Sequence, residues 1–241
     1  MNLEDLVMKG SLPEHVAVIM DGNRRWAKKH LMPVSYGHRE GALRVKDLTK
    51  TCVDMGIKYL TVYAFSTENW GREKKEVDYL MGLLIEFIKK ELNYLNDNNV
   101  KIKLLGNIED LPEETKMEVK RSIEMTKNNT KLTLSIALSY GSRTEMIDAV
   151  KKVITDCENN KINIDEIDEE SFKTYLYTND IPDPDLLIRT SGEIRLSNFL
   201  LYQLAYTEFY FTDIMWPDFN KEEFIKAIYS YQTRKRRYGK N

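Results

Sequence analysis

The chain has 241 residues, of which 42% are hydrophobic and 31% charged, and its formal net charge is −2 at pH 7. This length and composition are typical of one soluble domain with a sizeable core, and the near-neutral charge argues against a nucleic-acid partner. The two cysteines, Cys52 and Cys157, lie in unrelated contexts. A disulfide framework and a zinc site are therefore not expected, and a reducing cytoplasm fits.

No segment resembles a signal peptide or a membrane span. Residues 1–10 carry acids, and the apolar-rich stretches at 81–88 and 199–206 are interrupted by Glu86 and Gln203. Both fall short of the roughly 20 apolar residues that cross a bilayer. We expect a cytoplasmic protein that is at most loosely associated with the inner face of the membrane.

Short β-branched runs alternate with longer stretches of helical period. The runs predict six strands, at 15–20, 59–65, 100–105, 131–138, 185–188 and 208–211. The periodic stretches predict helices at 37–55, 73–96, 112–127, 143–159, 198–205 and from a cap at Asn220 to about 236. No repeat or linker divides the chain, so we predict one domain over 1–241, with an N-terminal arm at 1–12 and a basic C-terminal tail at 233–241.

The alternation of apolar strands and helices predicts an α/β fold with a central, mostly parallel six-stranded sheet flanked by helices. Ligands of such sheets bind beyond the carboxyl ends of the strands. Polar clusters or glycine turns follow five of the predicted strands, at 21–25, 66–70, 106–107, 139–141 and 189–192. We therefore expect one site along that edge.

Arginines are frequent in these clusters and directly after them, at positions 24, 25, 72, 189 and 195. A guanidinium group suits phosphate oxygens, so several arginines on one edge favour a polyanionic ligand. The acids among them are Asp21, Glu68, Glu193 and Glu208, and carboxylates beside bound phosphates are typical of Mg²⁺ sites.

The common nucleotide and hydrolase motifs are missing. The sequence has no GxxxxGK[ST], no GxGxxG after the first strand, no GxSxG, no HExxH and no DDxxD. The residues alone therefore predict a magnesium-assisted enzyme that acts on a phosphate or diphosphate ester.

Several segments together resemble the cis-prenyltransferase family, to which undecaprenyl diphosphate synthases belong. They are HVAVIMDGNRRWA at 15–27, Gly37-His38, YAFSTENW at 63–70, LIRTSGEIRLSNFL at 187–200, AYTEFYF at 205–211 and WPDF at 216–219. They span nearly the whole chain in the family's order and spacing. The resemblance implies the fold of undecaprenyl diphosphate synthase, with an apolar tunnel between the 73–96 helix and the sheet.

The resemblance also implies an activity: the Mg²⁺-dependent, sequential cis-condensation of isopentenyl diphosphate with an allylic diphosphate such as farnesyl diphosphate. The product would be a long-chain polyprenyl diphosphate, undecaprenyl diphosphate for a cell-wall lipid carrier. Arg237-Tyr238-Gly239 resembles a motif that completes the neighbouring subunit's site and implies a homodimer. Peripheral membrane contact would follow from the lipid product.

By the same resemblance, Asp21 and Asn69 are catalytic, and Asp21 and Glu208 bind Mg²⁺. An amide is a weak base, so we expect Asn69 to relay or position the proton rather than to capture it. The other matched positions are expected to bind substrate, and they are Gly22, Asn23, Arg24, Arg25, Trp26, His38, Ser66, Thr67, Glu68, Trp70, Arg72, Arg189, Arg195, Leu196 and Ser197.

Four further positions bear on substrate and product. Ala64 and Leu132 stand where the family controls chain length, and neither side chain would block a long tail. Val34 replaces an arginine that the family places four residues before His38, and this loss could weaken allylic diphosphate binding. Glu73, in Gly71-Arg72-Glu73, stands where many relatives have the proline of Asn-Arg-Pro, so the loop gains freedom.

Three alternatives remain open at this point. The chain could be a shorter-chain cis-prenyl diphosphate synthase, or a non-catalytic, diphosphate-binding partner subunit. The intact Asp21–Arg25 block speaks against the partner subunit, because such subunits tend to lose it. The third alternative, an unrelated nucleotide- or diphosphate-binding α/β protein, is disfavoured by the missing glycine-rich motifs.

Overall fold

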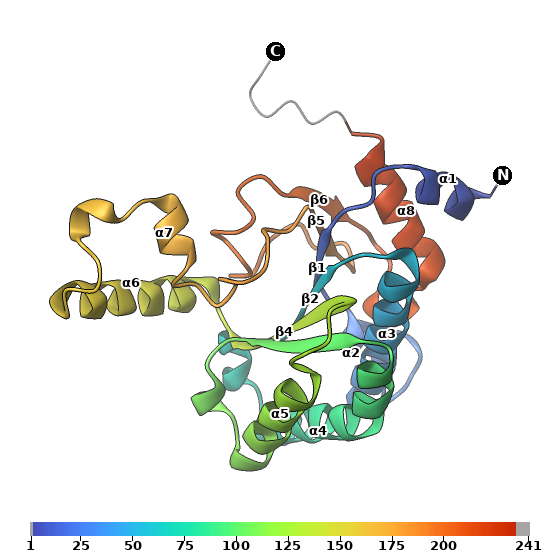
Figure 1. Cartoon of the computed structure of the whole chain (residues 1–241). Helices are drawn as coiled ribbons and strands as arrows, with labels where there is room; N and C mark the ends of the chain where they lie inside the picture. The colour runs from blue at the N-terminus through green and yellow to red at the C-terminus, as the bar shows by residue number, and fades with distance from the viewer. Residues whose placement is uncertain (1, 235–241) are drawn as a thin grey trace.

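A computed structural model of the chain describes residues 2–234 (Figure 1). Six strands form one sheet in the order β3-β4-β2-β1-β5-β6, and every neighbouring pair is parallel. The strands are β1 His15–Ile19, β2 Tyr59–Ser66, β3 Val100–Leu105, β4 Leu132–Tyr140, β5 Leu186–Arg189 and β6 Glu208–Phe211. All six predicted strands and the single α/β domain are confirmed.

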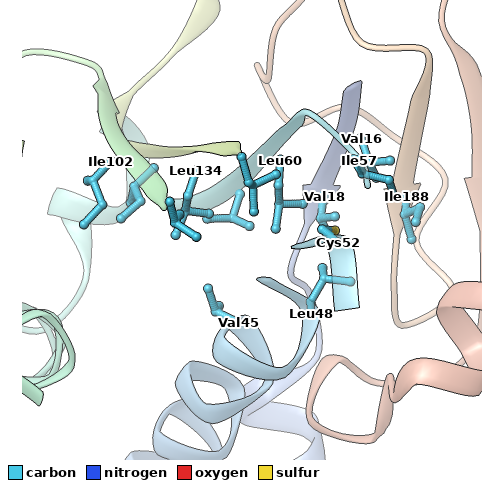
Figure 2. Packing of buried hydrophobic residues seen from close by; sticks show 14 of the residues in the cluster. Val16, Val18, Val45, Leu48, Cys52, Ile57, Leu60, Ile102, Leu134 and Ile188 are labelled. Carbon is cyan, nitrogen blue, oxygen red and sulfur yellow. The ribbon is translucent and has the colours of Figure 1, made fainter. Parts of the chain in front are cut away.

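The helices are α1 Leu3–Lys9, α2 Asn23–Lys29, α3 Val34–Met55, α4 Lys74–Asp97, α5 Glu113–Thr126, α6 Ser142–Glu158, α7 Glu169–Lys173 and α8 Lys221–Gln232. Helices α3, α4, α5 and α8 share one hydrophobic cluster with one face of the sheet. In Figure 2, Val45, Leu48 and Cys52 of α3 point toward Val18 and Leu60 of the strands. Helices α6 and α7 instead project away from the sheet, at the left of Figure 1.

The opposite face of the sheet is covered without a regular helix. Ala17 and Leu187 pack there against Phe199 and Leu204 in a second cluster. The helix predicted over 198–205 is therefore wrong. Ser197, Asn198 and Leu200 have φ angles of 49°, 61° and 46°, which a right-handed helix does not allow.

The predicted helices at 73–96, 112–127 and 143–159 are confirmed to within a residue or two. The sequence reasoning missed α1, α2 and α7, and α3 begins three residues earlier than predicted. Asn220 caps α8 by accepting a hydrogen bond from the backbone N–H of Glu223, as predicted, but α8 ends at Gln232. The Arg237-Tyr238-Gly239 motif and most of the basic tail lie outside the described residues.

The order of the strands creates a crevice at the carboxyl ends of β1 and β5. These strands are neighbours, with Ile19 in register with Arg189. The chain leaves β1 toward β2 on one side and leaves β5 toward β6 on the other. Loops that diverge in this way leave room between them, which is the usual place of ligands in open parallel sheets.

Within residues 2–234, no helix combines the length and the apolar character needed to cross a membrane.

Candidate active site

Asp21 and Arg189 meet at the crevice between β1 and β5. Arg189 Nη2 donates to Asp21 Oδ2 at 2.9 Å, and the arginine side chain is only 3% exposed. The backbone carbonyl of Asp21 accepts from Thr190 Oγ1 at 2.7 Å and from the N–H of Trp216 at 3.0 Å. The aspartate is thus fixed from both β5 and the 216–219 segment, as the prediction of one shared edge requires.

The remaining arginines of this end are also held by protein oxygens. Arg25 lies between two carboxylates, 3.3 Å from Asp21 Oδ1 and 2.9 Å from Glu193 Oε1. Arg195 pairs with Glu193, and this contact lowers the pKa of the Glu193 carboxyl. Arg189 Nη1 donates to Ser197 Oγ at 2.9 Å and to the carbonyl of Arg195.

Gly22 and Gly37 bring the backbone close to this site. Gly22 has a φ of 110°, and a Cβ there would lie 2.7 Å from Ser191 Oγ. A Cβ on Gly37 would lie 2.1 Å from the carbonyl oxygen of Asn23, so α2 and α3 can pack together only because this residue is glycine. Asn23 also lines the cavity, but its Oδ1 is buried against α3, where a Cβ on Gly41 would lie 2.4 Å from it, and it has no hydrogen-bond partner.

His38, Arg24 and Arg72 are tied together by Glu76 of α4. The Glu76 carboxylate lies 3.3 Å from His38 Nε2, 3.1 Å from Arg72 Nη1 and 3.8 Å from Arg24 Nη1. Burial lowers the pKa of His38, although the contact with Glu76 opposes this. The sequence reasoning did not include Glu76 in the site. The only feature of the sequence that pointed to it is its position four residues after Arg72.

The loop after β2 forms a short 3-10 helix, η1 Thr67–Gly71. Asn69 lines the cavity, and its Oδ1 accepts from the backbone N–H of Ser66 at 3.1 Å. Glu68 accepts from Asn198 Nδ2 at 3.0 Å, which links η1 to the loop after β5. The hydrogen bond from Ser66 fixes the orientation of the Asn69 amide at the start of η1.

One cavity of about 660 Å³ joins the charged residues to an apolar channel. Its polar end is lined by Asp21, Gly22, Asn23, Arg24, Arg25, His38, Ser66, Asn69, Arg72, Arg189, Glu193, Arg195 and Ser197. Its apolar end lies between α3, α4 and the sheet, and is lined by residues such as Val45, Val62, Leu84, Phe87 and Ile136. The predicted channel between the 73–96 helix and the sheet is thus present, and α3 contributes to its wall.

Ala64 lines the cavity, but Leu132 does not. Leu132 is the first residue of β4 and pairs with Val100 at the amino end of the sheet, away from the charged end.

Several predicted site residues do not line the cavity. Trp26 donates to Asp218 Oδ1 at 2.7 Å, and Trp70 donates to Ser139 Oγ at 2.9 Å. Both indoles thus fasten α2 and η1 to neighbouring segments. Thr67, Glu68 and Leu196 are likewise absent from the lining of the cavity.

Glu208 lies at the opposite edge of the sheet from Asp21. It is the first residue of β6, in register with Leu186, and its carboxylate pairs with Arg234 at 2.7 Å. At about 3.3 Å per residue, five residues along β1 separate its register position from Asp21 by roughly 16 Å. Asp21 and Glu208 therefore do not meet within one chain. A magnesium site that they share stays a prediction, and the arrangement of this chain alone does not support it.

The carboxylates at the polar end suit a weakly held magnesium ion. Among residues 2–234, no group of three or more His, Cys, Asp or Glu side chains is placed to hold a metal. Magnesium bound with substrate phosphates needs only one or two carboxylates. Asp21 fits this need, and Glu193 is the second acid nearby, since both contact Arg25.

Comparison with known proteins identifies similar prenyltransferases. The family model for undecaprenyl diphosphate synthase matches residues 19–239. An isoprenyl transferase of Clostridium perfringens is 51% identical over 98% of this chain and 93% of its own length. An isoprenyl transferase of Bacillus anthracis is 50% identical over 99% of this chain and 92% of its own length.

Two solved structures are also similar. Lavandulyl diphosphate synthase from Lavandula x intermedia, in complex with dimethylallyl diphosphate, has a TM-score of 0.92 and 36% identity, over 95% of this chain and 99% of that one. A probable undecaprenyl diphosphate synthase from Campylobacter jejuni has a TM-score of 0.78 and 34% identity, over the same shares of the two chains.

Proposed function

This chain belongs to the undecaprenyl diphosphate synthase family of prenyltransferases, and on that premise we propose that it extends an allylic diphosphate with isopentenyl diphosphate. The observation that carries the proposal is that one cavity has five arginines at one end and aliphatic side chains at the other. The charged end suits diphosphates, and the apolar end suits an isoprenoid tail. A nucleotide would not need the long apolar extension.

The reaction forms a bond between the terminal alkene carbon of isopentenyl diphosphate and C1 of the allylic substrate. The C1–O bond breaks, inorganic diphosphate leaves, and a proton is lost from the new chain. Guanidinium groups already held in place can stabilise the leaving diphosphate without reorganising at that moment. Arg24, Arg25 and Arg72 are proposed to face the allylic diphosphate, and Arg189 and Arg195 the isopentenyl diphosphate.

The bound diphosphates would take over the contacts that protein carboxylates now make with these arginines. Mg²⁺, held by Asp21 with Glu193 nearby, would supply further charge neutralisation at the phosphate oxygens. Asn69 would position the group that accepts the departing proton, because an amide is itself a weak base and the hydrogen bond with Ser66 holds it in place.

The direct test is incubation of purified protein with farnesyl diphosphate, labelled isopentenyl diphosphate and Mg²⁺. We expect label in butanol-extractable polyprenyl diphosphates, and long products because Ala64 leaves the channel open. A ladder that stops after a few additions would favour a shorter-chain synthase instead. No extractable product would leave only the diphosphate-binding partner subunit.

We also propose that the protein acts as a homodimer in the cytoplasm. Helix α6 exposes Ile147, Val150 and Ile154, which lie at helical spacing and form one apolar stripe on the projecting arm. A second copy could cover this stripe. Sedimentation equilibrium would give a dimer for the full chain and a shift toward monomer for Val150→Asp, and a monomeric parent protein would refute the dimer.

A further inference from the structure

We propose that the turn between α2 and α3 inserts its apolar side chains into the surface of an anionic lipid bilayer. The turn consists of residues His30–Val34, and we call it the tip turn. Delivery of a lipid product, which rests on the proposed function, would give this contact a purpose. The contact itself follows from exposure and charge at the tip turn, and can be measured without any turnover.

The tip turn exposes a continuous apolar run. Leu31 is 94% exposed, Met32 47% and Val34 38%, and Pro33 between them is also exposed. Single exposed apolar residues are ordinary on protein surfaces, but four consecutive ones at a tight turn are not. Together they form a small projecting wedge.

The tip turn is held firmly, so its exposure is a feature of the fold. The N–H of Met32 donates to the carbonyl of Ala27 at 2.9 Å, and Leu31 takes a φ of 56° to close the turn. Behind it, the ring of Trp26 lies 4.2 Å from that of His30 and stacks on Tyr36 at 6.3 Å. The wedge therefore stands on a rigid aromatic base.

Positive charge surrounds the tip turn. Lys28 and Lys29 end α2 directly before it and are exposed. Tyr79 of α4 donates to the carbonyl of Ser35 at 3.0 Å, which places Lys75, one helical turn earlier, near the same surface. Within residues 2–234 none of these three lysines forms an ion pair, although the exposed Asp78 lies beside Tyr79 in the sequence.

This combination of a short apolar wedge and unpaired lysines is typical of a contact with anionic lipid headgroups. A protein partner would instead need a broader complementary face, such as the stripe on α6. The tip turn is also close to the site. From Asn23, which lines the cavity, to Lys29 is six residues of helix, or about 9 Å.

The test is co-sedimentation of the full chain with vesicles of phosphatidylcholine, with and without phosphatidylglycerol. We expect binding to the mixed vesicles. Leu31→Asp should lower the partition coefficient about tenfold, because one large apolar side chain no longer inserts. Replacing Lys28 and Lys29 by alanine should lower it about fivefold for each lysine removed, on the anionic vesicles only.

Ile164→Asp is the matched control, since Ile164 is 73% exposed but lies on the projecting arm before α7. It should bind vesicles like the parent protein. Aspartate is well tolerated at positive φ, so Leu31→Asp should fold normally, which circular dichroism can check.

The proposal is overturned if the parent protein does not bind anionic vesicles, or if Leu31→Asp binds as well as the parent. If Leu31→Asp changes the sedimentation coefficient of the protein but not its vesicle binding, the tip turn contacts another protein chain. That result would also overturn the lipid proposal. Turnover with farnesyl diphosphate is measured separately, without vesicles. If the protein is inactive but still binds anionic vesicles through Leu31, the proposed function is wrong and the lipid contact is supported.

Discussion

Arg189 donates to Asp21 at 2.9 Å across the boundary between two adjacent strands, although the two residues are 168 positions apart in the chain. This contact joins the loops that leave β1 and β5 in opposite directions. Arg189 is buried, so the guanidinium group depends on the aspartate for its counter-charge.

Replacing Asp21 by asparagine should lower turnover by at least about 10²-fold, because it removes the charge that organises the leaving-group end. The variant should stay folded but less stable, because the amide keeps the shape of the side chain while the buried Arg189 loses its counter-charge. Steady-state incorporation of labelled isopentenyl diphosphate, with circular dichroism, is the measurement. Asp47→Asn, on the exposed side of α3, is the matched control and should retain full activity. Unchanged turnover in Asp21→Asn would show that Asp21 is not a catalytic residue.

Replacing Ala64 by leucine should shorten the products, because Ala64 lines the cavity and a larger side chain narrows the channel. Leu132→Met is the control. It changes a buried residue at the amino end of β4 that does not reach the cavity, and it conserves volume. Chromatography of dephosphorylated products should give shorter chains for the first variant only. Equal lengths in both would show that the tail does not pass Ala64.

Chelation should abolish activity and leave the fold unchanged. Within residues 2–234 no group of three or more candidate ligands is placed to hold a structural metal, so an ion at this site is held together with substrate. After EDTA treatment we expect no incorporation of label, the same thermal midpoint, and full recovery on adding MgCl₂. A midpoint that falls markedly on chelation would reveal a structural metal and contradict this reading.

Stability should fall in mild acid because of His15. Burial lowers the pKa of His15 to about 4 from its ordinary 6.5, and its ring nitrogens contact the carbonyl of Pro182 and the hydroxyl of Thr61. Between these two pH values the unfolded chain binds a proton that the folded chain does not. The free energy of unfolding should therefore decrease as the pH falls through this window, by up to about 3 kcal/mol from this group.

Urea unfolding at several pH values from 6.5 to 4 measures this effect. His15→Gln should be less stable near neutrality but should lose less stability on acidification than the parent protein. If His15→Gln and the parent show the same slope, the buried histidine is not the source.

Replacing Val34 by arginine should lower the KM for the allylic diphosphate about tenfold, by adding one charge-assisted contact. Val34 is the first residue of α3, partly exposed and four residues before His38, so a longer side chain can be accommodated. Met117→Arg, on exposed α5, controls for added charge. An unchanged KM would mean that the allylic diphosphate lies beyond the reach of position 34.

Much of the site was predictable because the sheet is parallel. Once Asp21 and Arg189 were each placed after a strand, their meeting at one edge followed from strand direction alone. Glu208 differs, because its metal role was taken from the resemblance and not from its place in the sheet. The predicted strand at 208–211 already begins with Glu208, and strand direction alone puts a first residue at the amino edge, away from Asp21.

The errors in the helices have local causes. Helix α2 carries only Trp26 and Ala27 as apolar residues and begins after Gly22 without a capping side chain, so no periodic signal marks it. The apolar run at 199–206 has the spacing of a helix, but positive φ angles at Asn198 and Leu200 break it. In that segment, burial against the sheet overrides local preference. Glu76 was missed because its three partners come from three different elements.

The arrangement around Arg25 has a consequence for which ligands bind at the polar end of the cavity. With Asp21 on one side and Glu193 on the other, this cation already carries its own counter-ions. A small singly charged anion would have to displace carboxylates that are close by and fixed, at little gain. A ligand with several negative charges can replace the carboxylates as the partner of Arg25. A cation that binds with this ligand can then neutralise the carboxylates that Arg25 has released. The polar end of the cavity should therefore bind simple monovalent anions weakly and diphosphates with their metal ion more strongly.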